Sequence, residues 1–219
     1  MIAAEIARRL LAAGRADEAL RTLDAAERGP SHWPHFDWED ARIDVLDALG
    51  RGEDAQATRW SCFESVFSAR RLRAWPDRLP DFDDDEAERR ALDLAGRHKD
   101  LLKGLSFLVS WKALDRAARL VIDRRAELDG DRYEILTPAA QALAEKHPLA
   151  ATLLLRTMVE FALTKARAGR YRHAARHLAE CASLAASIPA FEPFETHETW
   201  AARLKSRHGR KWGFWSLIA

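Results

Sequence analysis

Two histidines and a cysteine follow one another at steps of four residues near the C-terminal end of the sequence. His173, His177 and Cys181 would lie along one stripe of a helix, because residues four apart share a helix face. Histidine pairs at this spacing can bind zinc, and a cysteine thiolate is a good third ligand. The glutamate of a His-Glu-x-x-His metalloprotease motif is missing, since an alanine follows the first histidine. Two interpretations stay open: a zinc site that His197 or His208 completes from another helix, or a packed helix whose His and Cys fill a groove.

A second segment, from 203 to 215, mixes basic with aromatic residues. Five Lys or Arg crowd its first nine positions, and two tryptophans and a phenylalanine follow. Such a mixture can hold phosphates and stack bases. The same residues can instead form a terminal helix whose aromatic side chains cap the end of a helical stack while the basic ones stay in solvent. The binding candidates in this segment are Arg207, His208, Arg210 and Lys211.

Sequence signatures of an enzyme are missing. Glycine is too rare, at 10 of 219 residues, to form a phosphate-binding loop, and there is no nucleophile elbow. Cys62 and Cys181 are far apart in the sequence, which excludes a disulfide framework and fits a reducing compartment. The most apolar run, 149–163, is interrupted by Arg156 and Glu160 and falls short of the ~20 residues of a membrane span. We therefore expect a cytoplasmic protein without catalytic activity, cofactor or membrane partner.

The elements that must position these residues are helices. Ala, Leu, Arg, Asp and Glu dominate, whereas Gly and β-branched residues are sparse, and this composition favours helix. Apolar residues recur at three- and four-residue steps along most of the chain. We expect helices near 2–13, 16–27, 38–49, 53–68, 84–95, 98–109, 112–127, 137–146, 149–168, 171–187, 196–207 and 211–218. Prolines fall between these segments or in a first turn. The apolar run 149–163 predicts a central buried helix.

A Gly-Arg pair recurs where successive helices would meet. It occurs at Gly14, Gly50, Gly96 and Gly169, with a last copy at Gly209. The gaps of 36 to 46 residues between the clear N-terminal copies lie in the range of helical-repeat families. At such a corner one helix ends, glycine takes the left-handed conformation, and the next helix starts within a few residues. The sequence therefore predicts an all-α fold, an α-solenoid of stacked antiparallel helix pairs of tetratricopeptide (TPR) type with about 11–12 helices. We expect one helical-repeat domain over 1–219, with a weak sub-boundary near 78–84 that separates 1–78 from 84–219.

Four segments of the chain resemble an uncharacterised bacterial family of helical proteins. They are Leu128–Glu134, Pro148–Arg156, Tyr171–Leu178 and His208–Trp215. The resemblance covers most of the chain and implies a TPR-like helical-repeat fold, but no activity. Some relatives accompany a SWIM-type zinc finger, which this chain with two cysteines does not contain.

Charge is distributed unevenly along the chain. From Leu149 onward there are 11 Lys or Arg against 5 Glu and no Asp, a net charge of +6, whereas residues 1–148 carry −5. We therefore expect a scaffold that binds a protein, with an acidic peptide as the natural ligand of the basic end. The alternative is a nucleic-acid-associated accessory protein that uses the same basic face, and a zinc-binding protein is the third hypothesis. The asymmetry also allows a homo-oligomer. The candidate binding residues are Arg170, Arg172, His173, Arg176, His177, Arg207, His208, Arg210 and Lys211.

Overall fold

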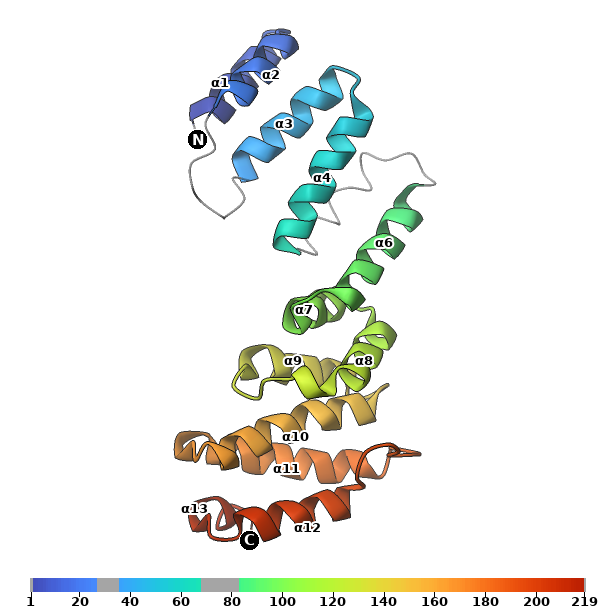
Figure 1. The fold of residues 1–219 in the computed structure, drawn as a ribbon, viewed down its shortest axis with the longest axis vertical. Coiled ribbons are helices and arrows are strands. Elements are labelled where there is room, and N and C mark those ends of the chain that lie inside the picture. The colour runs from blue at the N-terminus through green and yellow to red at the C-terminus, as the bar shows by residue number, and fades with distance from the viewer. Residues whose placement is uncertain (1, 27–35, 68–82, 219) are drawn as a thin grey trace. The chain divides into compact units, whose positions relative to one another are not determined.

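A computed structural model describes residues 2–26, 36–67 and 83–218 of the chain (Figure 1). These residues form twelve α-helices and two short 3-10 helices, and no strand occurs among them. The predicted all-α class is thereby confirmed. The chain divides into two compact units, Met1–Arg78 and Leu79–Ala219. In the described part of the chain, no helix is long and apolar enough to cross a membrane.

The N-terminal unit consists of two helical hairpins. Its helices are α1 (Ile2–Ala12), α2 (Ala16–Ala25), α3 (Phe36–Ala48) and α4 (Gly52–Val66). Helix α1 packs against α2 and α3, and α3 packs in turn against α4. The core is rich in alanine, which lets the helix axes approach closely. Its buried members are Ala4, Ala7, Ala19, Leu20, Leu23, Ala41, Val45, Leu46 and Ala55.

Both hairpins of this unit turn on the predicted glycines. Gly14 and Gly50 have φ angles of 74° and 69°, in the left-handed region that glycine enters without strain. Beyond Gly14, the Arg15 N–H donates to the Leu10 carbonyl at 2.9 Å, and beyond Gly50 the Arg51 N–H donates to Leu46 at 2.9 Å. This is the Schellman pattern, in which the first residues after a helix satisfy its last carbonyls. The predicted corner is confirmed at these two positions.

The C-terminal unit is a longer series of helices. In order they are α6 (Asp83–Arg97), α7 (Leu101–Trp111), α8 (Leu114–Asp123), η2 (Arg125–Glu127), α9 (Tyr133–Leu143), α10 (Pro148–Thr164), η3 (Ala168–Arg170), α11 (Tyr171–Ala185), α12 (His197–His208) and α13 (Trp212–Trp215). Helix α10 packs against α8, α9, α11 and α12. Eleven of its 17 residues are buried, which confirms the prediction of a central buried helix.

The predicted left-handed glycine is wrong at three positions in this unit. Gly96 lies inside α6 and Gly169 inside η3, Gly209 follows α12 with a φ of −56°, and none of the three has a positive φ. The left-handed conformation is taken instead by Lys112 after α7 (φ 65°) and by Ala166 after α10 (φ 50°). The Arg167 N–H donates to the Ala162 carbonyl at 2.9 Å, so the same hydrogen-bond pattern forms around an alanine. Packing of the flanking helices therefore decides where these turns fall, at the cost of a backbone conformation that alanine rarely adopts.

Helix α9 also starts earlier than predicted. We expected it to begin at 137 with Pro138 in its first turn, but it begins at Tyr133 and places Pro138 inside the helix. Proline lacks an N–H, so the Glu134 carbonyl has no intrahelical donor four residues on. The ring of Pro138 is exposed and lines a hollow beside the helix.

Candidate functional site

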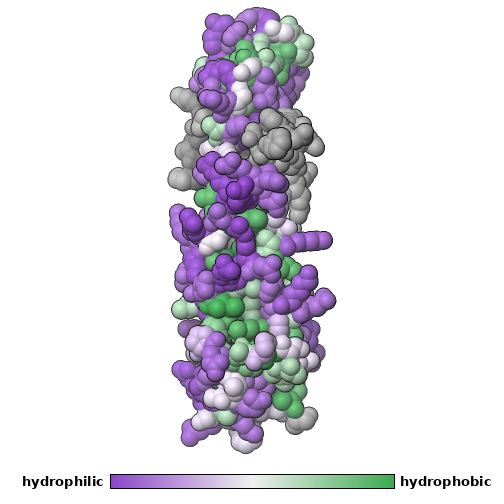
Figure 2. Space-filling model, turned by 90° about the vertical axis from the view of Figure 1, so that its right-hand side faces the viewer, coloured by the Kyte–Doolittle hydropathy of each residue, from purple (hydrophilic) through white to green (hydrophobic). Residues whose placement is uncertain are grey.

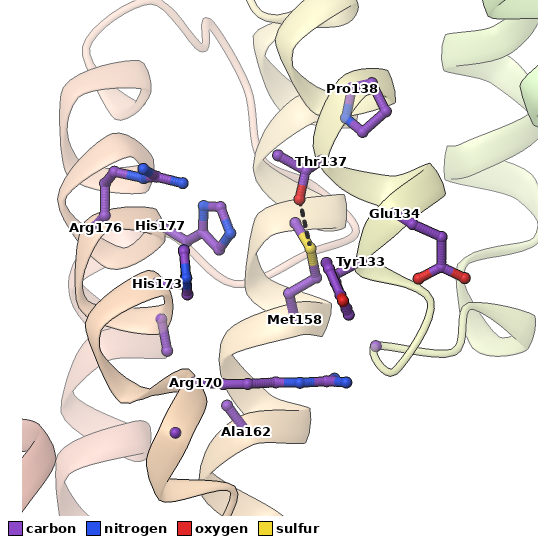
Figure 3. A pocket seen from close by; sticks show the side chains of 13 residues that line it. Tyr133, Glu134, Thr137, Pro138, Met158, Ala162, Arg170, His173, Arg176 and His177 are labelled. Carbon is purple, nitrogen blue, oxygen red and sulfur yellow. Dashed lines mark hydrogen bonds between the residues drawn. The ribbon is translucent and has the colours of Figure 1, made fainter.

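A hollow of about 480 Å³ opens between α9, α10 and α11 in the C-terminal unit (Figure 3). Four of the predicted binding residues line it together with residues of α9 and α10 that were not predicted. The full lining comprises Gly130, Tyr133, Glu134, Thr137, Pro138, Met158, Ala162, Gly169, Arg170, His173, Ala174, Arg176 and His177. Residues far apart in the sequence thus meet at one concave surface.

The floor of the hollow is apolar. Met158 and Ala162 of α10 and Ala174 of α11 are buried beneath it. The Thr137 hydroxyl, Oγ1, lies 3.4 Å from the Met158 sulfur and donates a weak hydrogen bond to it (Figure 3). On the face of the molecule drawn in Figure 2, hydrophobic surface is likewise visible between hydrophilic side chains at the level of α9 and α10. A flexible thioether in an apolar floor adapts readily to different side chains.

Arg170 forms one end wall of the hollow and is held in place on three sides. Its guanidinium carbon lies 4.6 Å from the Tyr133 ring centre and 5.6 Å from that of Phe161. Its Nη1 lies 2.7 Å from Asp131 Oδ1. The cation therefore joins the start of α9 to α10, and it keeps the half-exposed Tyr133 ring against the wall.

His177 and Arg176 share one carboxylate at the α11 wall. The buried His177 places its Nδ1 3.0 Å from Glu180 Oε2, and Arg176 Nε lies 3.8 Å from Glu180 Oε1. In Figure 3 both side chains extend from α11 towards α9. Arg176 and His173 are exposed, so they give the rim of the hollow a basic character.

A second, smaller hollow of about 310 Å³ continues between the same three helices. Thr137 lines both hollows, and Glu180 lines the second while it pairs with His177 of the first. The remaining lining is Ala140, Gln141, Ala144, Leu155, Ser183 and Leu184. We refer to the two hollows together as the α9–α11 groove.

The cysteine of the predicted metal stripe lies outside this groove. Cys181 is fully buried, and its Sγ faces the Thr152 carbonyl of α10 at 3.9 Å. Burial raises the pKa of its thiol to about 12, which disfavours the thiolate that zinc requires. Within the described residues, no group of three or more His, Cys, Asp and Glu side chains is placed to hold a metal ion. Helix α11 thus presents His173 and His177 to the groove and its cysteine to the interior.

The other predicted binding residues are distributed over two further places. Arg172 is exposed on α11 but does not line the groove. Arg207, Arg210 and Lys211 surround the turn between α12 and α13, where Lys211 is half-buried and the other two are exposed. His208 is half-buried there. Its burial, together with the neighbouring cations, lowers the pKa of its imidazole.

Aromatic residues anchor this C-terminal turn. Phe214 is fully buried, and its ring packs edge-on against Tyr171 at 5.8 Å. The Trp215 indole N–H donates to the His208 carbonyl at 2.9 Å. Trp212, by contrast, is 80% exposed beside the basic residues. Phe214 thus packs against the start of α11, while Trp212 stays in solvent.

Sequence reasoning missed the α9 and α10 sides of the groove. Tyr133, Thr137 and Met158 contribute its wall and floor, but as single residues on ordinary helices they carry no motif. The one available signal was the Gly130–Tyr133 stretch, since it belongs to a segment that carries the family likeness.

The molecule is thus an all-α protein with a groove of mixed apolar and basic character between three helices of its C-terminal unit. Over residues 1–217 the sequence matches the model of a family of unknown function (DUF6880), and the chain belongs to that family. No curated protein and no solved structure matches the sequence.

Proposed function

We propose that the protein is a non-catalytic helical scaffold that binds a peptide segment of a partner protein in the α9–α11 groove. The observation that carries this proposal is the groove itself, an open channel with an apolar floor and a basic rim. We further propose that the successive hairpins are repeats of a TPR-like α-solenoid. Adjacent helices in such folds expose concave surfaces of this kind.

The dimensions of the groove suit a short peptide. Its lining follows α9 from Tyr133 to Ala144, and at 1.5 Å per helical residue this stretch is about 16 Å long. An extended chain rises roughly 3.3 Å per residue, so about five residues fit. Met158 and Leu155 offer apolar contacts to side chains on one face of such a peptide.

The charges around the groove favour an acidic peptide. His173 and Arg176 are exposed at its rim, and Arg176 has only a long contact of 3.8 Å with Glu180, which His177 holds at 3.0 Å. The cationic rim thus remains available to an incoming carboxylate. We expect the preferred ligand to carry an apolar residue with an acidic residue beside it.

Panning of a random peptide display library against the purified protein tests this proposal. We expect enrichment of acidic-apolar sequences, and a synthetic peptide of that sequence should bind Arg176→Glu at least about fivefold more weakly, the scale of one lost charge contact. Thr137→Phe, which introduces a ring between the two hollows, should also weaken binding. Arg172→Glu is the matched control, because it makes the same charge change on the same helix outside the groove. Equal losses for Arg176→Glu and Arg172→Glu would refute the groove as the binding site.

A nucleic-acid function is the second candidate, and the exposed Trp212 favours it. The indole stands beside Arg210 and Lys211, an arrangement that can stack a base and hold a phosphate. Binding to a random single-stranded oligonucleotide should then weaken steeply with salt and be lost in Trp212→Ala. Flat salt dependence would exclude this function while leaving the peptide groove in place.

A further inference from the structure

A buried arginine in the C-terminal unit has two N–H groups without a hydrogen-bond acceptor. Arg156 of α10 is 2% exposed, and its Nη1 donates to the Glu195 carbonyl at 2.8 Å. Its Nε and Nη2 have no partner among the described residues. A guanidinium keeps its charge in proteins, so a full positive charge is buried with two donors unsatisfied, which is costly.

The aromatic rings around Arg156 do not remove this deficit. The guanidinium carbon lies 4.8 Å from the Trp200 ring centre and 5.4 Å from that of Phe191. These rings contact the flat face of the cation, whereas its N–H bonds lie in the plane of the guanidinium. Stacking therefore stabilises the charge but leaves the Nε and Nη2 hydrogens without acceptors.

The unsatisfied Nε–Nη2 edge has the geometry that recognises a carboxylate. Two parallel N–H groups on one side of a guanidinium match the two oxygens of a carboxylate or a related oxyanion. Three other arginines of this chain use the same edge for that purpose, at N–O distances of 2.5 to 2.9 Å for the closest contacts. They are Arg15 with Glu18, Arg124 with Glu127, and Arg203 with Glu195.

Further unsatisfied polar atoms lie in the same region. Arg125 Nε, His197 Nδ1 and Thr152 Oγ1 are buried and without a partner among the described residues. Thr152 precedes Arg156 by one helical turn, on the same face of α10. Burial lowers the pKa of both His197 and Arg156. The charge of Arg156 acts on His197 in the same direction, as does that of Arg125 on Arg156, so Arg156 lies within electrostatic reach of both groups.

The carboxylates nearby are already occupied. Arg203 pairs with both Glu160 and Glu195, at 3.0 and 2.8 Å, and Glu160 also accepts from the Trp200 indole at 2.6 Å. Three arginines (125, 156 and 203) thus face these two glutamates, and the exposed Glu198 also lies within electrostatic reach of Arg156 and His197.

We propose that the Nε–Nη2 edge of Arg156 binds a small oxyanion with the geometry of a carboxylate, with Thr152, Arg125 and His197 as further donors. Arg125 and His197 are only half-buried, so they form the side from which an anion enters. None of the four residues lines the α9–α11 groove, and the site is independent of the peptide-binding proposal.

Arginine-selective ¹H–¹⁵Nε spectra of the full-length protein test this site directly. Formate, acetate and inorganic phosphate are titrated separately against chloride at matched ionic strength. The Arg156 Nε–H resonance is assigned by its loss in Arg156→Lys. We expect this resonance to shift saturably with formate and with acetate. A similar shift with phosphate would indicate a general oxyanion site, and no shift with phosphate a carboxylate-specific one. The thermal midpoint should rise by about 3 °C or more when formate is at roughly ten times its Kd.

Two further variants keep the proposal testable if changes at Arg156 prevent folding. Thr152→Val and Arg125→Gln should each weaken formate binding several-fold, whereas Arg116→Gln, at a half-buried arginine that pairs with Asp93, should leave it unchanged. The proposal is overturned if none of the three anions shifts the Arg156 resonance relative to chloride, or if the shift persists in Thr152→Val and Arg125→Gln.

Discussion

At the scale of single residues, the groove depends on a close approach between the loop before α9 and helix α10. A Cβ atom on Gly130 would lie 2.5 Å from the Phe161 Cβ and 2.5 Å from the Thr157 carbonyl oxygen. Real Cβ atoms do not approach backbone so closely. Glycine is therefore required at this position by packing rather than by its φ angle.

Gly130→Ala should destabilise the protein by about 1–3 kcal/mol, because the backbone of α10 cannot move away from the added methyl group without strain. Urea unfolding followed by circular dichroism measures the effect. Gly169→Ala is the matched control on the opposite side of the groove, since a Cβ there meets nothing within 4 Å and the φ angle is not positive. A Gly130→Ala variant as stable as Gly169→Ala would contradict the packing argument.

The Arg203–Glu195 pair should make the free energy of unfolding depend on pH in the acidic range. The hydrogen bond from Arg203 lowers the pKa of Glu195 below its ordinary value of 4.5. A lowered folded-state pKa means that the stabilisation is present above the unfolded-state pKa and is lost as pH falls through the folded-state value. Arg203→Gln should therefore cost stability at neutral pH, by less than about 1 kcal/mol for so exposed a pair, and the difference from wild type should shrink below about pH 4.5. Urea titrations at several pH values measure it, and a difference that grows on acidification would refute the assignment.

At the scale of elements, the short helix α13 closes the end of α11. Two of its aromatic residues behave differently, since Phe214 is buried against Tyr171 while Trp212 is exposed. A helix of four residues has little stability of its own, and its position depends on this contact.

Phe214→Ala should destabilise the C-terminal unit by about 3 kcal/mol, the usual cost of removing a buried phenylalanine side chain. Trp212→Ala removes a larger side chain from the same helix but should change stability by less than about 0.5 kcal/mol, because its ring is in solvent. Thermal unfolding of both variants compares them under identical conditions. Similar losses for the two would show that Trp212 is covered in solution.

At the scale of the whole molecule, each compact unit contains one buried cysteine. Cys62 of α4 is 4% exposed and donates to Glu39, and Cys181 of α11 is fully buried. The two thiols can therefore report separately on the opening of the two units. Buried thiols react only after the surrounding structure opens.

We expect both thiols to react slowly with a disulfide reagent in the native protein, and Phe214→Ala should accelerate the reaction of Cys181 alone. The measurement uses Cys62→Ala and Cys181→Ala backgrounds, so that each rate belongs to one cysteine. The expected acceleration follows from the local free energy of opening, roughly tenfold for each 1.4 kcal/mol lost. Equal acceleration of Cys62 would show that the two units open together.

The sequence by itself determined the helices and much of one wall of the groove. Periodic apolar residues predicted every described helix to within a few residues, because a helix buries one face and thereby leaves its period in the sequence. The corners at Gly14 and Gly50 were predictable because few residues other than glycine adopt a left-handed turn without cost. The stripe of His173 and His177 was visible for the same reason, since residues four apart share a face.

Only the tertiary structure decided what these elements bring together. Packing between helices decides where the turns at Lys112 and Ala166 fall, where α9 starts, and that Pro138 lies inside α9. Such packing can override the local conformational preference of a residue by a few kcal/mol. The same packing turned Cys181 inward and placed Tyr133 and Met158 opposite α11. It also buried Arg156 among aromatic rings, although the sequence showed it only as an interruption in an apolar run. Side chains from several helices line the groove and surround Arg156, and contacts between such distant residues cannot be predicted from any single stretch of the sequence.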